Sequence, residues 1–444
     1  MQASPYRWVV LLAGILAYAT SQFARQNYAG IQKFMADDLH LDKAALGLLG
    51  SVFFYAYALF QMPWGFAADR FGSRWVTGLG ILLTAAAMFG FATGNDIDSL
   101  ILWRVISGVG GAAVYVAMAG GVARWFPASQ LGLSQAALGG VGGGLGESTA
   151  YFLLPLISIY LVAGWRQGTT MMAIATAGMG VLCLLLLRSA PTPAAAGGQP
   201  AGRPAPGFTW RLLKDPELWG YTFLFSAFII AIRVVQPWIA VYAADVFISA
   251  YGLDVNAAVL TGGTLVIVAY SLLGRGLGCP LGGRLSDALV SRGVSRASVA
   301  VGWLVLSVVL FQLLSTGVTV SWALAIVACL MGMSINLFTL ISAAIAETYG
   351  AERTASIVSF MNTLAQLAGA TALAVSGYVG VSLGSQAGHG LSEYRGVWLT
   401  AMVAVGVMTT VGAIVHVALA RGWLLRQGDP VPASPLPTAA QRRS

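Results

Sequence analysis

Long apolar stretches follow one another along most of this chain, and short polar segments separate them. A helix that crosses the hydrocarbon core of a bilayer needs about 20 apolar residues, and these stretches are near that length. Because a membrane-spanning helix satisfies its own backbone hydrogen bonds, the pattern favours helices. It predicts an all-α membrane protein with twelve spans, at residues 8–34, 44–68, 75–93, 99–123, 132–161, 168–188, 217–245, 257–283, 297–315, 320–346, 355–383 and 396–421.

The composition agrees with a chain that lies almost wholly in the membrane. Hydrophobic residues make up 57% of it and charged residues only 9%, whereas about 25% of a soluble protein is charged. In a soluble protein the net charge of +8 would suggest nucleic-acid binding, but here the basic residues lie in short loops between spans. We therefore expect the lipid bilayer as a partner and no nucleic acid.

Basic and acidic residues occupy loops on opposite sides of the predicted spans. Residues 69–74 and 284–296 are rich in arginine, whereas residues 35–42 and 94–98 are acidic. Cytoplasmic loops carry an excess of Lys and Arg. We therefore predict a multi-pass protein of the cell inner membrane with both termini in the cytoplasm.

A segment rich in Pro, Gly and Ala, residues 190–208, divides the spans into two groups of six. Such a composition forms no packed core and is typical of a flexible linker. The expected organisation is an N-terminal six-helix bundle at 1–189, a cytoplasmic linker at 190–214, a C-terminal six-helix bundle at 215–424 and a disordered cytoplasmic tail at 425–444.

The two groups share a short pattern after their second span. A glycine precedes an aspartate by four residues at Gly65 and Asp69, and again at Gly283 and Asp287, with basic residues following. Many secondary transporters are built from such duplicated halves, with the substrate site near the membrane midplane between them.

The first of these loops, GFAADRFGSR at residues 65–74, resembles the signature loop G-x-x-x-D-R-x-G-R-R between the second and third helices of the major facilitator superfamily, with Ser73 as the departure. The sequence RVISGVG at residues 104–110 resembles the motif of that superfamily's fourth helix. The resemblance implies two pseudo-symmetric six-helix bundles. It also implies a set of gating residues, namely Gly65, Asp69, Arg70, Arg74, Arg104 and, in the repeat, Asp287.

An arginine, Arg25, interrupts the first span. A cation within a membrane helix costs about 2.5–3.5 kcal/mol on insertion scales, so it is rarely without a function. Residues at three- and four-residue spacings share one helix face, and here that face is polar: Tyr18, Ser21, Gln22, Arg25, Tyr28 and Gln32. A polar face of this kind contacts protein or water rather than lipid.

Arg233 is the counterpart of Arg25 in the seventh span, which begins the second half of the chain. Guanidinium groups stay charged and bind carboxylates or phosphates through paired hydrogen bonds. We therefore predict that the two arginines bind an anion, although both are alternatively structural cations. Arginines on the first and seventh helices resemble the organophosphate:phosphate antiporters and the related anion:cation symporters of the superfamily.

Glu147 lies deep in the fifth span. It either carries a coupled proton, pairs with Arg25 when the site is empty, or forms a fixed structural ion pair. The glycines around it, spaced for close helix packing, are Gly139, Gly142, Gly143 and Gly146. Neutral polar residues in the spans either contact the substrate or join helices, and the candidates for substrate contact are Gln22, Tyr28, Tyr115, Gln135, Asn336, Asn362 and Gln366.

These features predict a secondary active transporter that moves a small organic anion, a carboxylate or a phosphate ester, and is coupled to protons or to anion exchange. The alternatives are a nitrate/nitrite-type porter, a proton-driven efflux pump and a transporter-like ligand sensor. We expect no enzyme, because the sequence contains no nucleophile–base pattern. The three cysteines and three histidines have no ligand spacing, so we expect neither a metal nor a cofactor. We expect a monomer.

Overall fold

The computed structural model describes residues 5–126, 130, 133–135, 137–162, 164–188, 210–334, 337–349, 351–387 and 390–426. Within these ranges the chain is helical, with no β-strand. The predicted linker falls mostly on residues outside the description, and so do residue Asn336 and the tail beyond Arg426. Residues 210–214 of the predicted linker form a short 3₁₀ helix, η4 (Trp210–Lys214).

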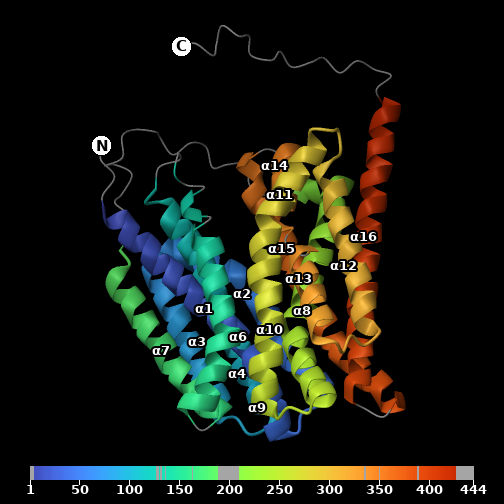
Figure 1. The fold of residues 1–444 in the computed structure, drawn as a ribbon. Coiled ribbons are helices and arrows are strands. Elements are labelled where there is room, and N and C mark those ends of the chain that lie inside the picture. Colours follow the sequence, from blue (N-terminus) through green and yellow to red (C-terminus); the bar gives the residue numbers. More distant parts are fainter. Residues whose placement is uncertain are drawn as a thin grey trace.

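The first half of the chain forms long helices that run back and forth across the molecule (Figure 1). They are α1 (Tyr6–Leu39), α2 (Lys43–Phe71), α3 (Ser73–Thr93), α4 (Ile97–Ala123), the π-helical turn η1 (Ala137–Gly142), α6 (Gly143–Leu156), the π-helical turn η2 (Ile157–Leu161) and α7 (Trp165–Leu186).

The second half repeats this arrangement with more interruptions. Its elements are α8 (Pro216–Tyr251), α9 (Val255–Ala258), the π-helical η5 (Val259–Gly263), α10 (Thr264–Ile267), the π-helical η6 (Val268–Arg275), α11 (Gly276–Val290), α12 (Arg296–Ser315), α13 (Ser321–Ser334), α14 (Phe338–Tyr349), α15 (Ala351–Ala387), the 3₁₀ helix η7 (Gly390–Ser392) and α16 (Glu393–Arg426).

Among the described residues, 11 helical segments are long and apolar enough to cross a membrane. The expected span at 320–346 is the exception, because the structure describes it as α13 and α14, and α13 has only 14 residues. Residues 335 and 336, between the two helices, lie outside the description. The all-α membrane fold is confirmed, and the predicted span at 320–346 is described only in two parts.

Acidic residues of the loops begin several helices. The carboxylates of Asp42, Asp96 and Asp254 each accept a hydrogen bond from the backbone N–H group of the residue three positions later, at 2.8–2.9 Å. These bonds satisfy N–H groups that have no partner within the helix. At Asp96 they lower the pKa of the carboxyl group. The acidic loops of the sequence are therefore, in part, helix caps.

Glycine allows α6 to pack directly on α1. A Cβ atom at Gly146 would overlap the carbonyl oxygen of Ala19, and one at Gly142 would lie 2.9 Å from the carbonyl oxygen of Ile15. Gly30 of α1 approaches α6 in the same way, against the carbonyl oxygen of Ala150. The prediction that these glycines serve helix packing is confirmed for Gly142 and Gly146.

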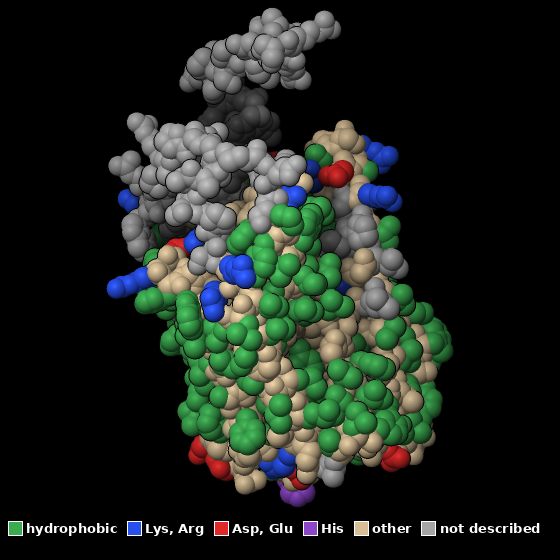
Figure 2. All heavy atoms as spheres, turned by 90° about the vertical axis from the view of Figure 1, so that its left-hand side faces the viewer, with side chains coloured by type: hydrophobic (Ala, Val, Ile, Leu, Met, Phe, Trp, Pro, Cys, Tyr) green, Lys and Arg blue, Asp and Glu red, His purple; other side chains and the backbone are tan. Residues whose placement is uncertain are grey.

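The surface and the chain ends agree with a membrane protein. Hydrophobic side chains cover the middle of the face in Figure 2, and charged side chains gather at its two ends. The exposed apolar residues include Leu59, Phe66, Leu133 and Tyr160. The beginning of α1 and the end of α16 lie on the same side of the molecule (Figure 1), which we call the terminal side.

Candidate functional site

Arg233 lies in the interior, on the helix α8. It is 4% exposed. Its Nε donates to the side-chain oxygen of Gln366 at 2.9 Å, and its Nη1 donates to the side-chain oxygen of Gln236 at 3.3 Å. The guanidinium carbon lies 4.1 Å from the centre of the Phe54 ring. All three neighbours are uncharged, so the positive charge of Arg233 is solvated by dipoles and a ring face but is not neutralised by them.

Helix α15 shapes the place where Arg233 lies. A Cβ atom at Gly369 would lie 2.8 Å from Cγ of Arg233, so glycine leaves room for the arginine side chain. Gln366 and Asn362 precede Gly369 on α15 by three and seven residues. Gln366 donates to Asn362 at 3.2 Å, and Asn362 donates to Gln61 of α2 at 3.2 Å. A chain of amides therefore leads from Arg233 to the first half of the protein.

Gln236, one turn after Arg233, joins three helices. Its Nε2 donates to Glu147 of α6 at 2.8 Å, and its Oε1 accepts from Gln26 of α1 at 2.8 Å. Its backbone oxygen accepts the hydroxyl of Tyr151 at 2.8 Å. Gln236 is only 2% exposed. Its side-chain amide and its backbone oxygen bond to helices α1 and α6 of the first half and to Arg233.

Glu147 forms an ion pair with Arg275, the last residue of η6. The Nη1 of Arg275 lies 2.5 Å from Oε1 and 2.6 Å from Oε2 of the carboxylate. In this conformation the hydrogen-bonded ion-pair partner of Glu147 is Arg275, and the pairing of Glu147 with Arg25 in the empty site stays a prediction. The ion pair joins the two halves of the chain at the centre of the molecule.

Arg25 is half-buried on α1, and its Nε has no hydrogen-bond partner in the described part of the structure. It lies within electrostatic range of Glu147 and of Arg233. The two arginines predicted as a pair therefore belong to one region. Like charges at close range are unfavourable in a poorly solvated interior, and an anion between them would relieve this repulsion.

The remaining sequence candidates divide between this region and others. The amides Asn362 and Gln366 belong to the network of Arg233, and Gln22 is buried against Gly146. The ring of Tyr115 lies 4.9 Å from that of Tyr18. Gln135 donates to the carbonyl oxygen of Ala119 at 2.9 Å.

Tyr28 follows Arg25 by three residues on α1, and its side chain contacts α2 and α4. Its hydroxyl donates to the carbonyl oxygen of Leu46 at 2.5 Å, and the guanidinium of Arg104 lies 4.8 Å from the centre of its ring. Asn336 lies outside the described residues.

Sequence reasoning missed Gln26, Gln61 and Gln236. Each is a polar residue in an apolar span, and Gln26 and Gln236 lie one and three residues from an arginine that was identified. That proximity was the available signal. The partners of these glutamines come from helices that are distant in the sequence, so their part in the network was not evident without the fold.

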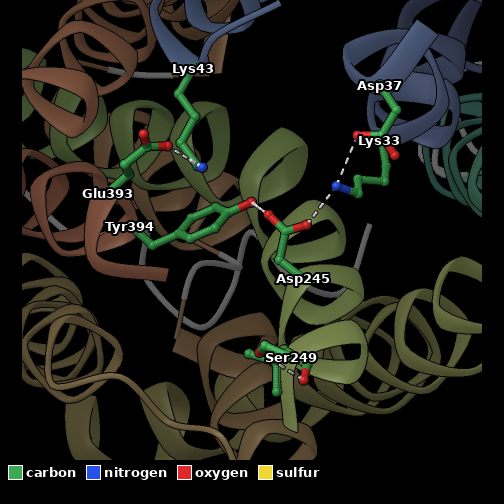
Figure 3. Close-up of polar contacts among 8 residues, drawn as sticks. Lys33, Asp37, Lys43, Asp245, Ser249, Glu393 and Tyr394 are labelled. Carbon is green, nitrogen blue, oxygen red and sulfur yellow. Dashed lines mark hydrogen bonds and ion pairs between the residues drawn. The ribbon is translucent and has the colours of Figure 1, made fainter. Parts of the chain in front are cut away.

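A second cluster joins the halves on the side opposite the terminal side, and we call it the outer gate: Lys33, Lys43, Asp245, Glu393 and Tyr394 (Figure 3). Lys33 of α1 lies 2.9 Å from a carboxylate oxygen of Asp245 on α8, and 3.0 Å from Asp37 on its own helix. Lys43 of α2 forms an ion pair with Glu393 of α16.

Tyr394 links the two ion pairs of the outer gate. Its hydroxyl donates to Asp245 at 2.7 Å, and the ammonium nitrogen of Lys43 lies 4.4 Å from the centre of its ring. The helices α2 and α15 also touch here, since a Cβ atom at Gly47 would lie 2.9 Å from the carbonyl oxygen of Leu373. The halves are therefore held together on this side.

Comparison with known proteins identifies the family. The family model described as Major Facilitator Superfamily matches residues 14–373. The chain belongs to the major facilitator superfamily. Its fold agrees, because the structure of a bacterial homolog of the human lysosomal transporter Spinster, in an inward-facing and unoccupied conformation, aligns with a TM-score of 0.73 over 97% of this chain and 100% of that chain, at 17% identity.

Proteins with sequences similar to this chain include named transporters. Probable anion transporter 4, chloroplastic, of Oryza sativa is 24% identical over 85% of this chain and 64% of its own length. The probable sulfoacetate transporter SauU of Cupriavidus necator is 23% identical over 64% of this chain and 66% of its own length. The first four relatives by similarity are matched over 29–64% of their length, so the aligned part is less than two thirds of each.

The signature loop of the superfamily lies on the terminal side, and its charged residues contact described residues of the first half. Asp69 forms an exposed ion pair with Arg124 at 3.1 Å. Arg70 and Arg74 lie over the rings of Phe71 and Trp75. At the repeat of this loop, Asp287 pairs with Arg296 at 2.9 Å.

The other two residues assigned by the superfamily motifs face helices of the first half. A Cβ atom at Gly65 would lie 3.4 Å from Val116 of α4. Arg104 is buried, its Nε donates to the carbonyl oxygen of Leu49 at 3.1 Å, and its guanidinium lies 4.7 Å from the centre of the Phe53 ring. Among the described residues of this member of the superfamily, the ion pairs of the terminal side therefore lie inside the halves, whereas those of the outer gate join the halves.

Proposed function

We propose that this membrane transporter is a secondary active transporter that moves a small organic anion, a carboxylate or a phosphate ester, by alternating access. The observation that carries the proposal is the pair Arg25 and Arg233, one half-buried on α1 and one buried on α8, which interact electrostatically with each other and, among the described residues, with the carboxylate of Glu147. A guanidinium fork matches the geometry of a carboxylate or a phosphate. The names of the relatives, an anion transporter and a sulfoacetate transporter, support the same class of substrate.

Alternating access requires contacts between the halves that break when the other side closes. The outer gate supplies such contacts through Lys33–Asp245 and Lys43–Glu393. Because the terminal-side ion pairs stay within the halves, the conformation corresponds to a carrier closed at the outer gate. We propose that transport is coupled to protons, through Glu147, or to exchange of a counter-anion.

The surroundings of the protein belong to the same proposal. The loops rich in arginine lie on the terminal side, and cytoplasmic loops are the basic ones. We propose a monomer in the cell inner membrane with both termini in the cytoplasm.

The test is ligand binding followed by flux. Thermal-shift measurements with organic phosphates, monocarboxylates, dicarboxylates and nitrate would identify an anion that stabilises the wild type. Loss of one charged hydrogen-bonding group costs about 1.5–3 kcal/mol, so Arg25→Gln and Arg233→Gln are expected to weaken binding about 10- to 150-fold. Arg292→Gln, in an exposed loop, removes the same charge elsewhere and serves as the matched control.

The flux measurement is counterflow of the identified anion in proteoliposomes. Counterflow by the wild type and by Arg292→Gln, and its absence in the two central variants, is the expected result. Equal stabilisation of all four proteins by the anion would contradict the arginine pair, and binding without counterflow would favour a ligand sensor over a transporter.

A further inference from the structure

Arg275 was not assigned to the substrate, yet it lies in the same region as the arginine pair. Its side chain is 31% exposed, whereas the side chain of its partner Glu147 is 4% exposed. The carboxylate is therefore enclosed, while the side chain of Arg275, which reaches from the second half to Glu147 in the first, retains accessible surface. An arginine in this position is available to an anion that enters between the halves.

Glu147 is held in the way that a substrate anion would be held. It projects from α6 in the first half, and both of its donors, Arg275 and Gln236, come from the second half. Its two oxygens contact one guanidinium nitrogen, and a neutral amide completes the shell of one of them. This donor set binds a carboxylate regardless of whether the carboxylate belongs to the protein or to a ligand.

The charges of the region do not balance. Arg25, Arg233 and Arg275 all interact electrostatically with Glu147, which is the carboxylate that they share. One carboxylate neutralises one guanidinium group, so among these four described residues the positive charges exceed the negative charge by two. Such an excess is unfavourable unless anions compensate it.

We propose that Arg275 binds one of two anionic groups of the substrate, and that Glu147 takes the place of that group while the site is empty. The inference rests on the proposed function, since Arg25 and Arg233 hold the other anionic group. The substrate class is thereby narrowed to dianions with two separate anionic groups, such as dicarboxylates or sulfocarboxylates.

Displacement of Glu147 has a consequence for coupling. A buried carboxylate that loses its cation is strongly destabilised as an anion, so it takes up a proton when the substrate replaces it. The groups that face it are Arg25 on α1, Tyr151 on α6, Gln236 and Arg233 on α8, and Tyr270 and Arg275 on η6. Glu147 is the carboxylate among these groups, so we expect it to take up one proton when a dianion binds.

The first experiment compares succinate with succinamate, in which an amide replaces one carboxylate, and glucarate with gluconate. Arg275→Gln is expected to weaken binding of each dianion at least tenfold relative to the wild type, and to change binding of each monoanion less than threefold. Arg275→Lys retains a charge and is expected to fall between the wild type and Arg275→Gln for the dianions only.

The second experiment tests the displacement of Glu147. Between about pH 6.5 and 8.5, where succinate stays a dianion, one proton taken up on binding raises the apparent Kd of the wild type by at most tenfold for each pH unit. In Glu147→Gln the competing charge is absent, so succinate is expected to bind more tightly than to the wild type and without this pH dependence.

The outcomes separate this inference from the proposed function. If no anion of the panel binds, both are wrong. If anions bind through Arg25 and Arg233 but Arg275→Gln affects succinate and succinamate alike, or the wild type prefers the monoanion of each pair, the inference on Arg275 is wrong and the proposed function stands. Unchanged pH dependence in Glu147→Gln would also overturn it.

Discussion

At the scale of single residues, the central region depends on which neighbours of each arginine are charged. Arg275 has a carboxylate partner in Glu147, whereas Arg233 has the amides Gln366 and Gln236 and the ring of Phe54. Neutral acceptors orient a guanidinium without cancelling its charge. In the proposed function Arg233 is therefore preorganised for an anion, at the cost of a buried charge in the empty protein.

The neutrality of Gln366 leads to a prediction. Gln366→Glu places a carboxylate 2.9 Å from Nε of Arg233, at the position of the present amide oxygen. The new ion pair would satisfy the arginine internally, so anion binding is expected to fall more than tenfold while thermal stability stays equal or rises. Binding and thermal unfolding of the purified variant measure both quantities.

A matched control for this variant is Gln312→Glu, which makes the same change at an exposed position of α12. It is expected to leave anion binding unchanged. Undiminished binding in Gln366→Glu would mean that the charge of Arg233 is not used for the substrate.

At the scale of elements, the spans that supply the central ion pair are those with π-helical turns. Glu147 lies in α6, between η1 and η2, and Arg275 ends η6. π-helical turns are rare and occur frequently at functional sites. The close contact of α6 with α1 fixes the height of Glu147 relative to Arg25, because Gly142 and Gly146 bring the two backbones together.

The contact between α1 and α6 can be tested with two glycines of α6 that are two residues apart. A Cβ atom at Gly146 would overlap the carbonyl oxygen of Ala19, whereas nothing lies within 4 Å of one at Gly144. Overpacking costs about 1–3 kcal/mol, so Gly146→Ala is expected to lower thermal stability and to impair transport.

Gly144→Ala is expected to be neutral or slightly stabilising, because alanine favours the helix over glycine. Thermal unfolding in detergent compares the two variants directly. Equal stability of both would mean that α6 moves away from α1 without cost.

At the scale of the whole molecule, we propose that the outer gate sets the balance between the two conformations of the carrier. Its ion pairs join α1 to α8 and α2 to α16, and Tyr394 links them (Figure 3). An ion pair near the surface contributes at most about 1 kcal/mol. Removal of one ion pair should therefore shift the ratio of the two conformations by up to about fivefold. Such a shift is measurable without unfolding the protein.

Lys33→Ala is accordingly expected to increase the population that is open at the outer gate. Distance measurements between spin labels at residues 40 and 249, on the outer ends of α1 and α8, would detect longer distances in the variant. Asp38→Ala removes an ion pair with Arg166 that lies within the first half, and it is expected to leave the distribution unchanged. The same shift in both variants would contradict a specific role for the outer gate.

The fold class followed from the sequence alone, and the arginines Arg25 and Arg233 stood out in it as charges within apolar spans. These features are local, because the length of an apolar stretch and the cost of a buried charge can be evaluated without knowing any neighbour. The prediction of the superfamily rested on two short motifs that lie at residues 65–74 and 104–110, and it is confirmed.

Which charges meet became evident from the packing of the helices. Glu147 pairs with Arg275, 128 residues away, and Lys43 pairs with Glu393, 350 residues away. Such pairs depend on how two groups of helices pack against each other, and no periodicity in either partner's own helix encodes that geometry. The central site and the outer gate are therefore properties of the junction between the halves, whereas the helices that carry them follow from the sequence.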